Sequence, residues 1–117
     1  MNTEYSTQTI SSAGPQYPPT TEETDPIDNQ KFIGKIRMTI LSSYKLLKVD
    51  ISKHQKKKNL KKIKESMEII IESLNNEIYV IEEETRYKMK KSVHDNLTKL
   101  YNNLKKLNKM YSNILKV

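Results

Sequence analysis

An unbroken series of apolar residues near the C-terminal end restricts the folding of this chain more than any other feature. Its members alternate at steps of four and three residues and are Val93, Leu97, Leu100, Leu104, Leu107, Tyr111 and Ile114. Most residues between them are Lys, Asn, Ser or Thr, so the apolar face is narrow, as in a coiled coil. A lone helix of this length is marginal in water. These residues therefore form a predicted partner-helix seam, covered by the same chain or by another chain.

Two more apolar series precede the seam and predict two further helices. The first begins at Asp25-Pro26, where Asp can cap a helix and Pro suits the first helical position, and it extends to about residue 52. Its apolar face contains Ile33, Ile36, Ile40, Tyr44, Leu47 and Ile51, flanked by Leu41, Leu46 and Val49. The second contains Leu60, Ile63, Met67, Ile70, Ile71, Leu74, Ile78 and Ile81, flanked by Val80.

The sequence indicates the first connection between these helices more clearly than the second. Residues 52–59 contain no apolar side chain and predict a connection. The second turn is placed between residues 75 and 92, with Asn75-Asn76 and the capping-box-like segment 92–95 as candidate breaks. Residues 82–91 nevertheless have a helical composition, with a Glu82–Arg86 pair at i,i+4, so one continuous helix over residues 59–116 is the alternative. Three helices are the favoured interpretation.

The chain divides by composition into a tail and a folded part. Residues 1–24 are rich in Pro, Ser and Thr and carry almost no apolar side chains, which predicts a disordered acidic tail. Residues 25–117 are predicted to form an all-α domain, a small antiparallel bundle of about three helices with coiled-coil character in the last one. A core of this size is marginal, so oligomerisation or a partner would help to stabilise it.

Charge is distributed unevenly along the chain. Residues 1–30 contain five acidic and no basic residues, whereas the remaining 87 residues hold 21 basic and nine acidic ones, a net charge of +12. The densest basic segment contributes Lys53, Lys56, Lys57, Lys58, Lys61, Lys62 and Lys64. This cluster predicts a diffuse contact with nucleic-acid phosphates, an anionic membrane surface or an acidic protein, and a nuclear-import segment is another interpretation. A plain solvated helix start is the structural alternative.

No motif in the sequence indicates catalysis. There is no cysteine and no glycine-rich phosphate loop, and the two histidines have no partners at ligand spacing. We therefore expect no enzyme activity, cofactor, metal or small-molecule substrate. Without an apolar segment long enough for a signal peptide or a membrane span, an intracellular protein of the cytoplasm or nucleus is expected. The sequence thus predicts a helical interaction subunit or adaptor that binds protein partners or copies of itself.

Overall fold

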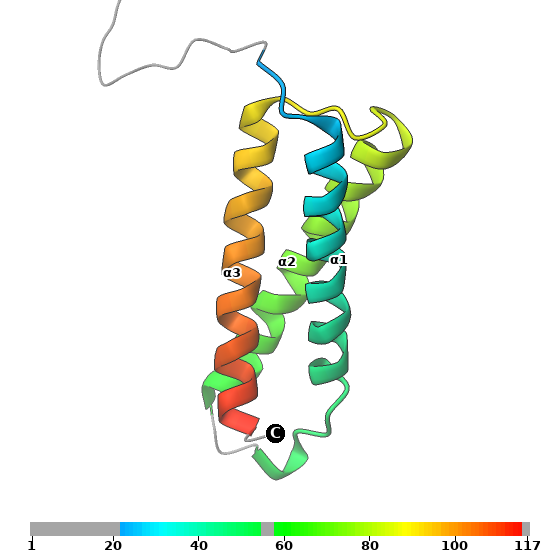
Figure 1. Cartoon of the computed structure of the whole chain (residues 1–117). Coiled ribbons are helices and arrows are strands. Elements are labelled where there is room, and N and C mark those ends of the chain that lie inside the picture. Colours follow the sequence, from blue (N-terminus) through cyan, green and yellow to red (C-terminus); the bar gives the residue numbers. More distant parts are fainter. Residues whose placement is uncertain (1–21, 55–57, 116–117) are drawn as a thin grey trace, which may run out of the picture.

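Three helices make up the fold, in a computed structural model that describes residues 22–54 and 58–115 (Figure 1). They are α1 (Pro26–Leu47), α2 (Lys58–Glu83) and α3 (Lys91–Leu115), with a short 3-10 turn, η1 (Ser52–His54), after α1. Successive helices run in opposite directions, and α2 crosses obliquely behind the other two (Figure 1). The predicted all-α bundle is confirmed, and the alternative of one continuous helix after residue 59 is wrong.

The start of α1 follows the predicted capping chemistry. Asp25 adopts an extended conformation, and its Oδ1 accepts a hydrogen bond from the Ile27 backbone N–H at 2.8 Å, with Pro26 in the first turn. The helix ends at Leu47, earlier than the predicted residue 52. Val49 and Ile51 lie beyond this end and still pack against the core. Apolar spacing placed the boundary too late because residues in a connection can also be buried.

The turn between α2 and α3 lies within the predicted window but not at a predicted break. Asn75-Asn76 lies inside α2, which continues to Glu83, and α3 begins at Lys91. Arg86 and Tyr87 take left-handed backbone conformations, with φ of 51° and 69°. Helical continuation through residues 82–91 is therefore wrong. Such φ values are uncommon for residues other than Gly, and tertiary contacts have to hold them.

Asn29 supplies one of these contacts. Its side chain is fully buried, and its Nδ2 donates to the carbonyl oxygens of Tyr87 at 2.9 Å and Thr24 at 3.4 Å. Glu23 and Lys90 form an isolated antiparallel bridge beside it. One amide on α1 thus joins the segment before the first helix to the turn before the third. Residues 22–24 belong to the folded part, and residues 1–21 of the predicted tail lie outside the described residues.

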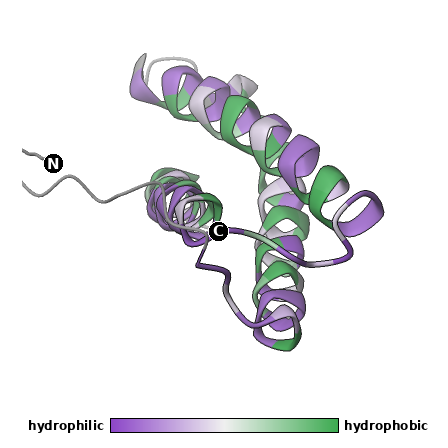
Figure 2. Ribbon diagram, turned by 90° about the horizontal axis from the view of Figure 1, so that it is seen from above, coloured by the Kyte–Doolittle hydropathy of each residue, from purple (hydrophilic) through white to green (hydrophobic). Residues whose placement is uncertain are grey.

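The core lies between all three helices, and α2 and α3 pack together most extensively. Figure 2, viewed from above, shows apolar and polar residues mixed along the helices that are seen from the side. The buried apolar side chains are Ile33, Ile36, Ile40, Leu60, Ile63, Met67, Ile71, Leu74, Ile78, Ile81, Met89, Leu97, Leu104, Tyr111 and Leu115. The predicted face of α2 is confirmed, with Ile70 partly buried. On α1, Leu41 and Tyr44 were assigned to the inner face but are exposed.

Candidate functional site

The predicted partner-helix seam on α3 lies mainly against the helices of the same chain. Leu97, Leu104 and Tyr111 are completely buried within the bundle. The other seam residues are partly buried and pack against the same core; they are Val93, Leu100, Leu107 and Ile114. Most of the apolar surface of the seam therefore has a partner without a second chain, and its role in binding another protein stays a prediction.

The lysine cluster does not form one continuous stripe in the described residues. Lys56 and Lys57 lie outside them, and the side chain of Lys58 is not described. Lys53, Lys61 and Lys62 are exposed and Lys64 is half-buried. Lys61 and Lys64 are three residues apart and lie on neighbouring positions of α2, whereas Lys62 points away from both. They do share the N-terminal end of α2, where the positive end of the helix dipole adds to their charge. Binding of nucleic acid or anionic lipid stays a prediction.

A second, outward-facing stripe runs along α1. Its members recur at steps of four and three residues, and all are exposed: Ile27, Lys31, Gly34, Met38, Leu41 and Lys45. We call this set the α1 outer stripe. The exposed fractions of Ile27, Met38 and Leu41 are 65%, 67% and 55%, which is high for three apolar side chains on one helix face. Apart from its chain neighbours and the adjacent backbone of α1, no described heavy atom lies within 4 Å of the position that a Gly34 Cβ would take, so no other helix packs closely on that glycine.

A stripe with the same spacing runs along the outside of α2. Its members are again all exposed and are Glu65, Ile69, Glu72, Asn76, Tyr79 and Glu83. We call this set the α2 outer stripe. The exposed fractions of Ile69 and Tyr79 are 65% and 63%. The two outer stripes differ in charge, since α1 contributes lysines and α2 contributes glutamates between the apolar positions.

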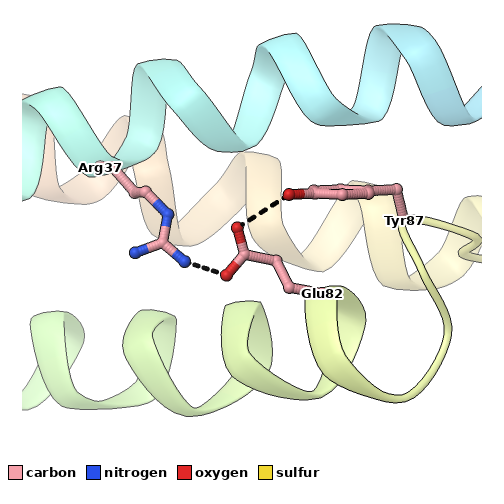
Figure 3. Close-up of polar contacts among 3 residues, drawn as sticks. All are labelled: Arg37, Glu82 and Tyr87. Atoms are coloured by element: carbon pink, nitrogen blue, oxygen red, sulfur yellow. Dashed lines mark hydrogen bonds and ion pairs between the residues drawn. The ribbon is translucent and has the colours of Figure 1, made fainter.

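Polar contacts between α1 and α2 show where the two outer stripes lie. Arg37 on α1 forms an ion pair with Glu82 on α2, and the Tyr87 hydroxyl donates to the other carboxylate oxygen of Glu82 at 3.1 Å (Figure 3). Further along, Asn75 Nδ2 donates to the Tyr44 hydroxyl at 3.2 Å. These side chains border the contact between α1 and α2 on its solvent side, because each pair is exposed or only partly buried.

The nearest outer-stripe residues adjoin this border directly. Leu41 follows Arg37 by four residues and precedes Tyr44 by three, and such neighbours share one helix face. Tyr79 has the same relation to Asn75 and to Glu82 on α2. Both Leu41 and Tyr79 are exposed, so they lie on the outer side of the border. Leu41 and Tyr79 therefore adjoin the solvent side of the α1–α2 contact, and we call the surface around them the α1–α2 outer face. Met38 and Ile69 lie roughly 100° or more around their helices from Arg37 and Asn75 and point further away from this contact.

A separate groove lies where the turn joins α2 to α3. Its volume is about 900 Å³. Val80, Ile81, Met89 and Val93 supply its apolar lining, and charged residues of both signs surround them. Val80 was expected to flank the core and is instead 42% exposed at this groove. The mixed charges around the groove do not select one class of ligand.

The described side chains include one histidine, His94, which takes part in a packing contact. His94 stacks on Phe32 with ring centroids 4.8 Å apart, which is a packing contact between α3 and α1. Within residues 22–54 and 58–115, no group of three His, Cys, Asp or Glu side chains is placed to hold a metal ion. The expected Glu82–Arg86 pair is replaced by Glu82–Arg37, because α2 ends before Arg86.

Among the described residues, buried side-chain oxygens of Asn29, Glu77, Asn108 and Tyr111 lack a hydrogen-bond partner. The Tyr111 hydroxyl is buried and has no hydrogen-bond partner among the described residues. Burial, and secondarily the negative charge of Glu68, raises the pKa of Tyr111 above its ordinary value. Asn29 Oδ1 likewise has no partner, whereas its Nδ2 is used twice. Both residues contribute to the interior of the fold and not to an open site.

Comparison with protein-family models, with curated proteins and with solved structures finds no match for this chain. Among the described helices, none combines the length and apolar character that crossing a bilayer requires.

Sequence reasoning did not identify the α1–α2 outer face. The signal was present in the alternating spacing of Ile27, Gly34, Met38 and Leu41, but lysines interrupt it and a more regular apolar series lies beside it. On α2, Ile69 and Tyr79 are separated by two charged or polar stripe members. Only the exposure of these side chains in the folded chain separates an outer stripe from the edge of an inner one.

Proposed function

We propose that this chain is a non-enzymatic helical interaction subunit that binds other helices through the α1–α2 outer face. The observation that supports this proposal is the exposure of Leu41 and Tyr79 beside the α1–α2 contact, with Met38 and Ile69 exposed further around the same two helices. Single exposed apolar residues are normal, but a group at helical spacing on adjacent helices is typical of an interaction surface.

The chemistry of this surface suits the binding of an amphipathic helix. Its apolar residues lie at the spacing with which one helix contacts another, and lysines and glutamates surround them. Gly34 has no side chain at the middle of the α1 outer stripe, and this permits close approach of a second helix. Burying each large apolar side chain would contribute about 1.5–3 kcal/mol before ordering costs are subtracted.

Affinity capture from native cells with quantitative mass spectrometry tests the proposal. We compare the wild-type chain with the double variant Met38→Lys/Leu41→Lys and with Lys99→Ala, an exposed change on α3. All three should retain the same helix content by circular dichroism, because the changed side chains are exposed. The double variant should lose the proteins that the wild type and Lys99→Ala retain. Equal recovery by all three would contradict the proposal.

A further inference from the structure

We infer that a groove between α1 and α3 binds the phosphate group of a phosphate monoester, as a bound ligand and not as a substrate. We call it the α1–α3 groove, and its volume is about 370 Å³. Leu46 supplies its apolar lining, and its polar lining consists of Thr39, Ser42, Lys105, Asn108, Lys109 and Ser112. The inference does not depend on the proposed function, because the α1–α3 groove and the α1–α2 outer face are different surfaces.

The packing of α1 against α3 explains why the bundle is hollowed at this point. The two helices run in the same direction (Figure 1), and near their N-terminal ends Phe32 packs against the rings of His94 and Tyr101, with centroids 4.8 and 5.6 Å away. Seven residues further along each helix, on the same face, Thr39 takes the place of Phe32 and Asn108 takes the place of Tyr101. These side chains are smaller and polar, so they leave space between the helices.

The charges that line the α1–α3 groove are of one sign. Lys105 and Lys109 belong to the lining, and none of the lining residues is acidic. The surrounding helices reinforce this charge: residues 29–47 of α1 contain four basic and no acidic residues, and residues 96–115 of α3 contain four lysines and no acidic residue. Six glutamates lie instead on α2. An anion in the groove therefore meets two ammonium groups and no opposing carboxylate in the lining.

Hydroxyl groups supply hydrogen-bond donors at the same place. Within the described residues, the hydroxyls of Ser43 and Thr98 donate to the carbonyl four residues earlier. Those of Thr39, Ser42 and Ser112, which line the groove, have no hydrogen-bond partner in the described part of the chain. Each of the three can donate one hydrogen bond to a ligand without giving up a bond inside the fold.

Two further side chains add donors to this set. Lys105 Nζ lies 4.5 Å from the centroid of the Tyr101 ring, a cation–π contact that restrains the side chain without using an acceptor oxygen. Asn108 contributes an amide whose buried atom is Oδ1, and its Nδ2 carries two more N–H donors. The α1–α3 groove therefore combines ammonium, hydroxyl and amide donors around one small volume.

This donor set suits a phosphate monoester better than other anions. A monoester carries a charge of about −1.5 to −2 at pH 7 and three acceptor oxygens, which correspond to the two lysines and three hydroxyls of the lining. Lysine binds anions as a point charge and does not form the planar, bidentate pair with which arginine recognises carboxylates. The volume lies near the lower end of the range of about 300–1,000 Å³ for ligand pockets, so a small molecule or one lipid headgroup fits.

Titration of the full-length chain with glycerol 3-phosphate tests the site, with amide chemical shifts in two-dimensional NMR spectra as the measurement. The groove variant is Lys105→Gln/Lys109→Gln, and the matched control is Lys99→Gln/Lys106→Gln, which removes the same charge from the same helix outside the groove. All four lysines are exposed, so folding should be unaffected and is checked by circular dichroism. Thr39→Val removes one hydroxyl and keeps the shape of the side chain.

Vesicle sedimentation distinguishes the two sources of the monoester. Vesicles that contain phosphatidic acid present monoester headgroups, whereas vesicles with phosphatidylglycerol at the same surface charge present phosphodiesters alone. Binding of free glycerol 3-phosphate without vesicle binding assigns the groove to a soluble ligand. Preference for phosphatidic acid over phosphatidylglycerol assigns it to a lipid headgroup. Either result supports the inference if the groove variant loses the binding and the control retains it.

The wild type should bind the monoester saturably, and the groove variant should bind it at least about tenfold more weakly. Thr39→Val should weaken binding by about threefold to tenfold, and the Lys99/Lys106 control should stay within about threefold of the wild type. Absence of saturable binding to both forms of the monoester would overturn the inference. Equal weakening in the control and the groove variant, or equally tight binding of duplex DNA or phosphatidylglycerol, would show a general attraction to polyanions and would also overturn it.

Discussion

Replacing Leu104 by Ala tests whether the α3 seam is covered by its own chain in solution. Leu104 is fully buried in the middle of α3, so its truncation removes apolar surface and leaves a cavity. Comparable Leu→Ala changes lower the free energy of unfolding by about 2–5 kcal/mol, and complete burial places this one at about 3–4 kcal/mol. Ala itself favours a helix, so backbone propensity does not add to the loss.

The expected loss is large relative to the stability of such a small fold. A domain of about 90 residues has an unfolding free energy of roughly 5–13 kcal/mol. A loss of 3–4 kcal/mol should lower Tm by roughly 15–25 °C. Urea denaturation followed by far-UV circular dichroism measures the change. Leu107→Ala, at a partly buried position, should cost less, and Lys99→Ala should stay within about 0.5 kcal/mol of the wild type.

The measurement is made in the Met38→Lys/Leu41→Lys background, so that association through the outer face does not contribute to stability. Two protein concentrations that differ about twentyfold are compared. The denaturation midpoint should be independent of concentration, because the seam is buried within one chain. A loss below about 1 kcal/mol for Leu104→Ala, or a midpoint that rises with concentration in this background, would refute intramolecular burial of the seam.

Three further predictions rest on the structure, and a fourth rests on the lysine cluster of the sequence. Asn29→Asp should lower the unfolding free energy by about 2–4 kcal/mol at pH 7, because a carboxylate cannot donate to the Tyr87 and Thr24 carbonyls. The introduced carboxyl should have a raised pKa, so the unfolding free energy measured by urea denaturation should recover as the pH falls. Gly34→Ala should raise the unfolding free energy by about 0.5–1 kcal/mol, and Tm with it, since the new Cβ meets open space. Tyr111→Phe should raise the unfolding free energy by about 1 kcal/mol at pH 7, because it removes a buried hydroxyl that lacks a partner. Duplex DNA binding through the lysine cluster, Lys53–Lys64, should weaken steeply with salt in a fluorescence titration.

Each of these predictions has a contrary outcome. Asn29→Asp with wild-type stability at pH 7 would show that the turn does not depend on the amide. A lower Tm for Gly34→Ala would mean that another backbone packs on this glycine. Loss of stability in Tyr111→Phe would mean that the hydroxyl has a partner in solution. Negligible duplex binding at low salt would exclude the nucleic-acid alternative.

The raised pKa of Tyr111 predicts that the unfolding free energy falls at high pH. Burial raises the pKa of Tyr111 in the folded chain above its unfolded value of about 10. The unfolded chain therefore loses this proton first. The contribution to stability is complete below pH of about 10 and is lost as the pH rises through the folded pKa. Subtracting the pH profile of Tyr111→Phe from that of the wild type, each obtained by urea denaturation, should isolate this slope; identical profiles above pH 10 would contradict it.

The elements of the fold were predictable where local chemistry and periodicity agree. Asp25 and Pro26 marked the start of α1 because capping depends only on neighbouring backbone groups. The inner face of α2 followed from spacing alone, because a long helix with many buried positions gives a repeated signal. The turn after Glu83 was not predictable in the same way, since its residues favour a helix locally. Asn29, distant in sequence, binds the Tyr87 carbonyl and helps to hold the chain in a left-handed conformation that local preference opposes.

The candidate site was harder to predict because a helix can carry two apolar faces at once. The heptad on α3 indicates that its apolar surface has to be covered. It does not indicate whether the same chain or another chain covers it. Assignment becomes possible once burial is known: Leu97, Leu104 and Tyr111 are enclosed by the bundle, whereas Met38 and Leu41 stay exposed on a helix whose inner face is filled. The less regular stripe is therefore the one that still lacks a covering surface. In this bundle, the strongest apolar periodicity forms the core, so the proposed association would use the weaker stripes that charged residues interrupt.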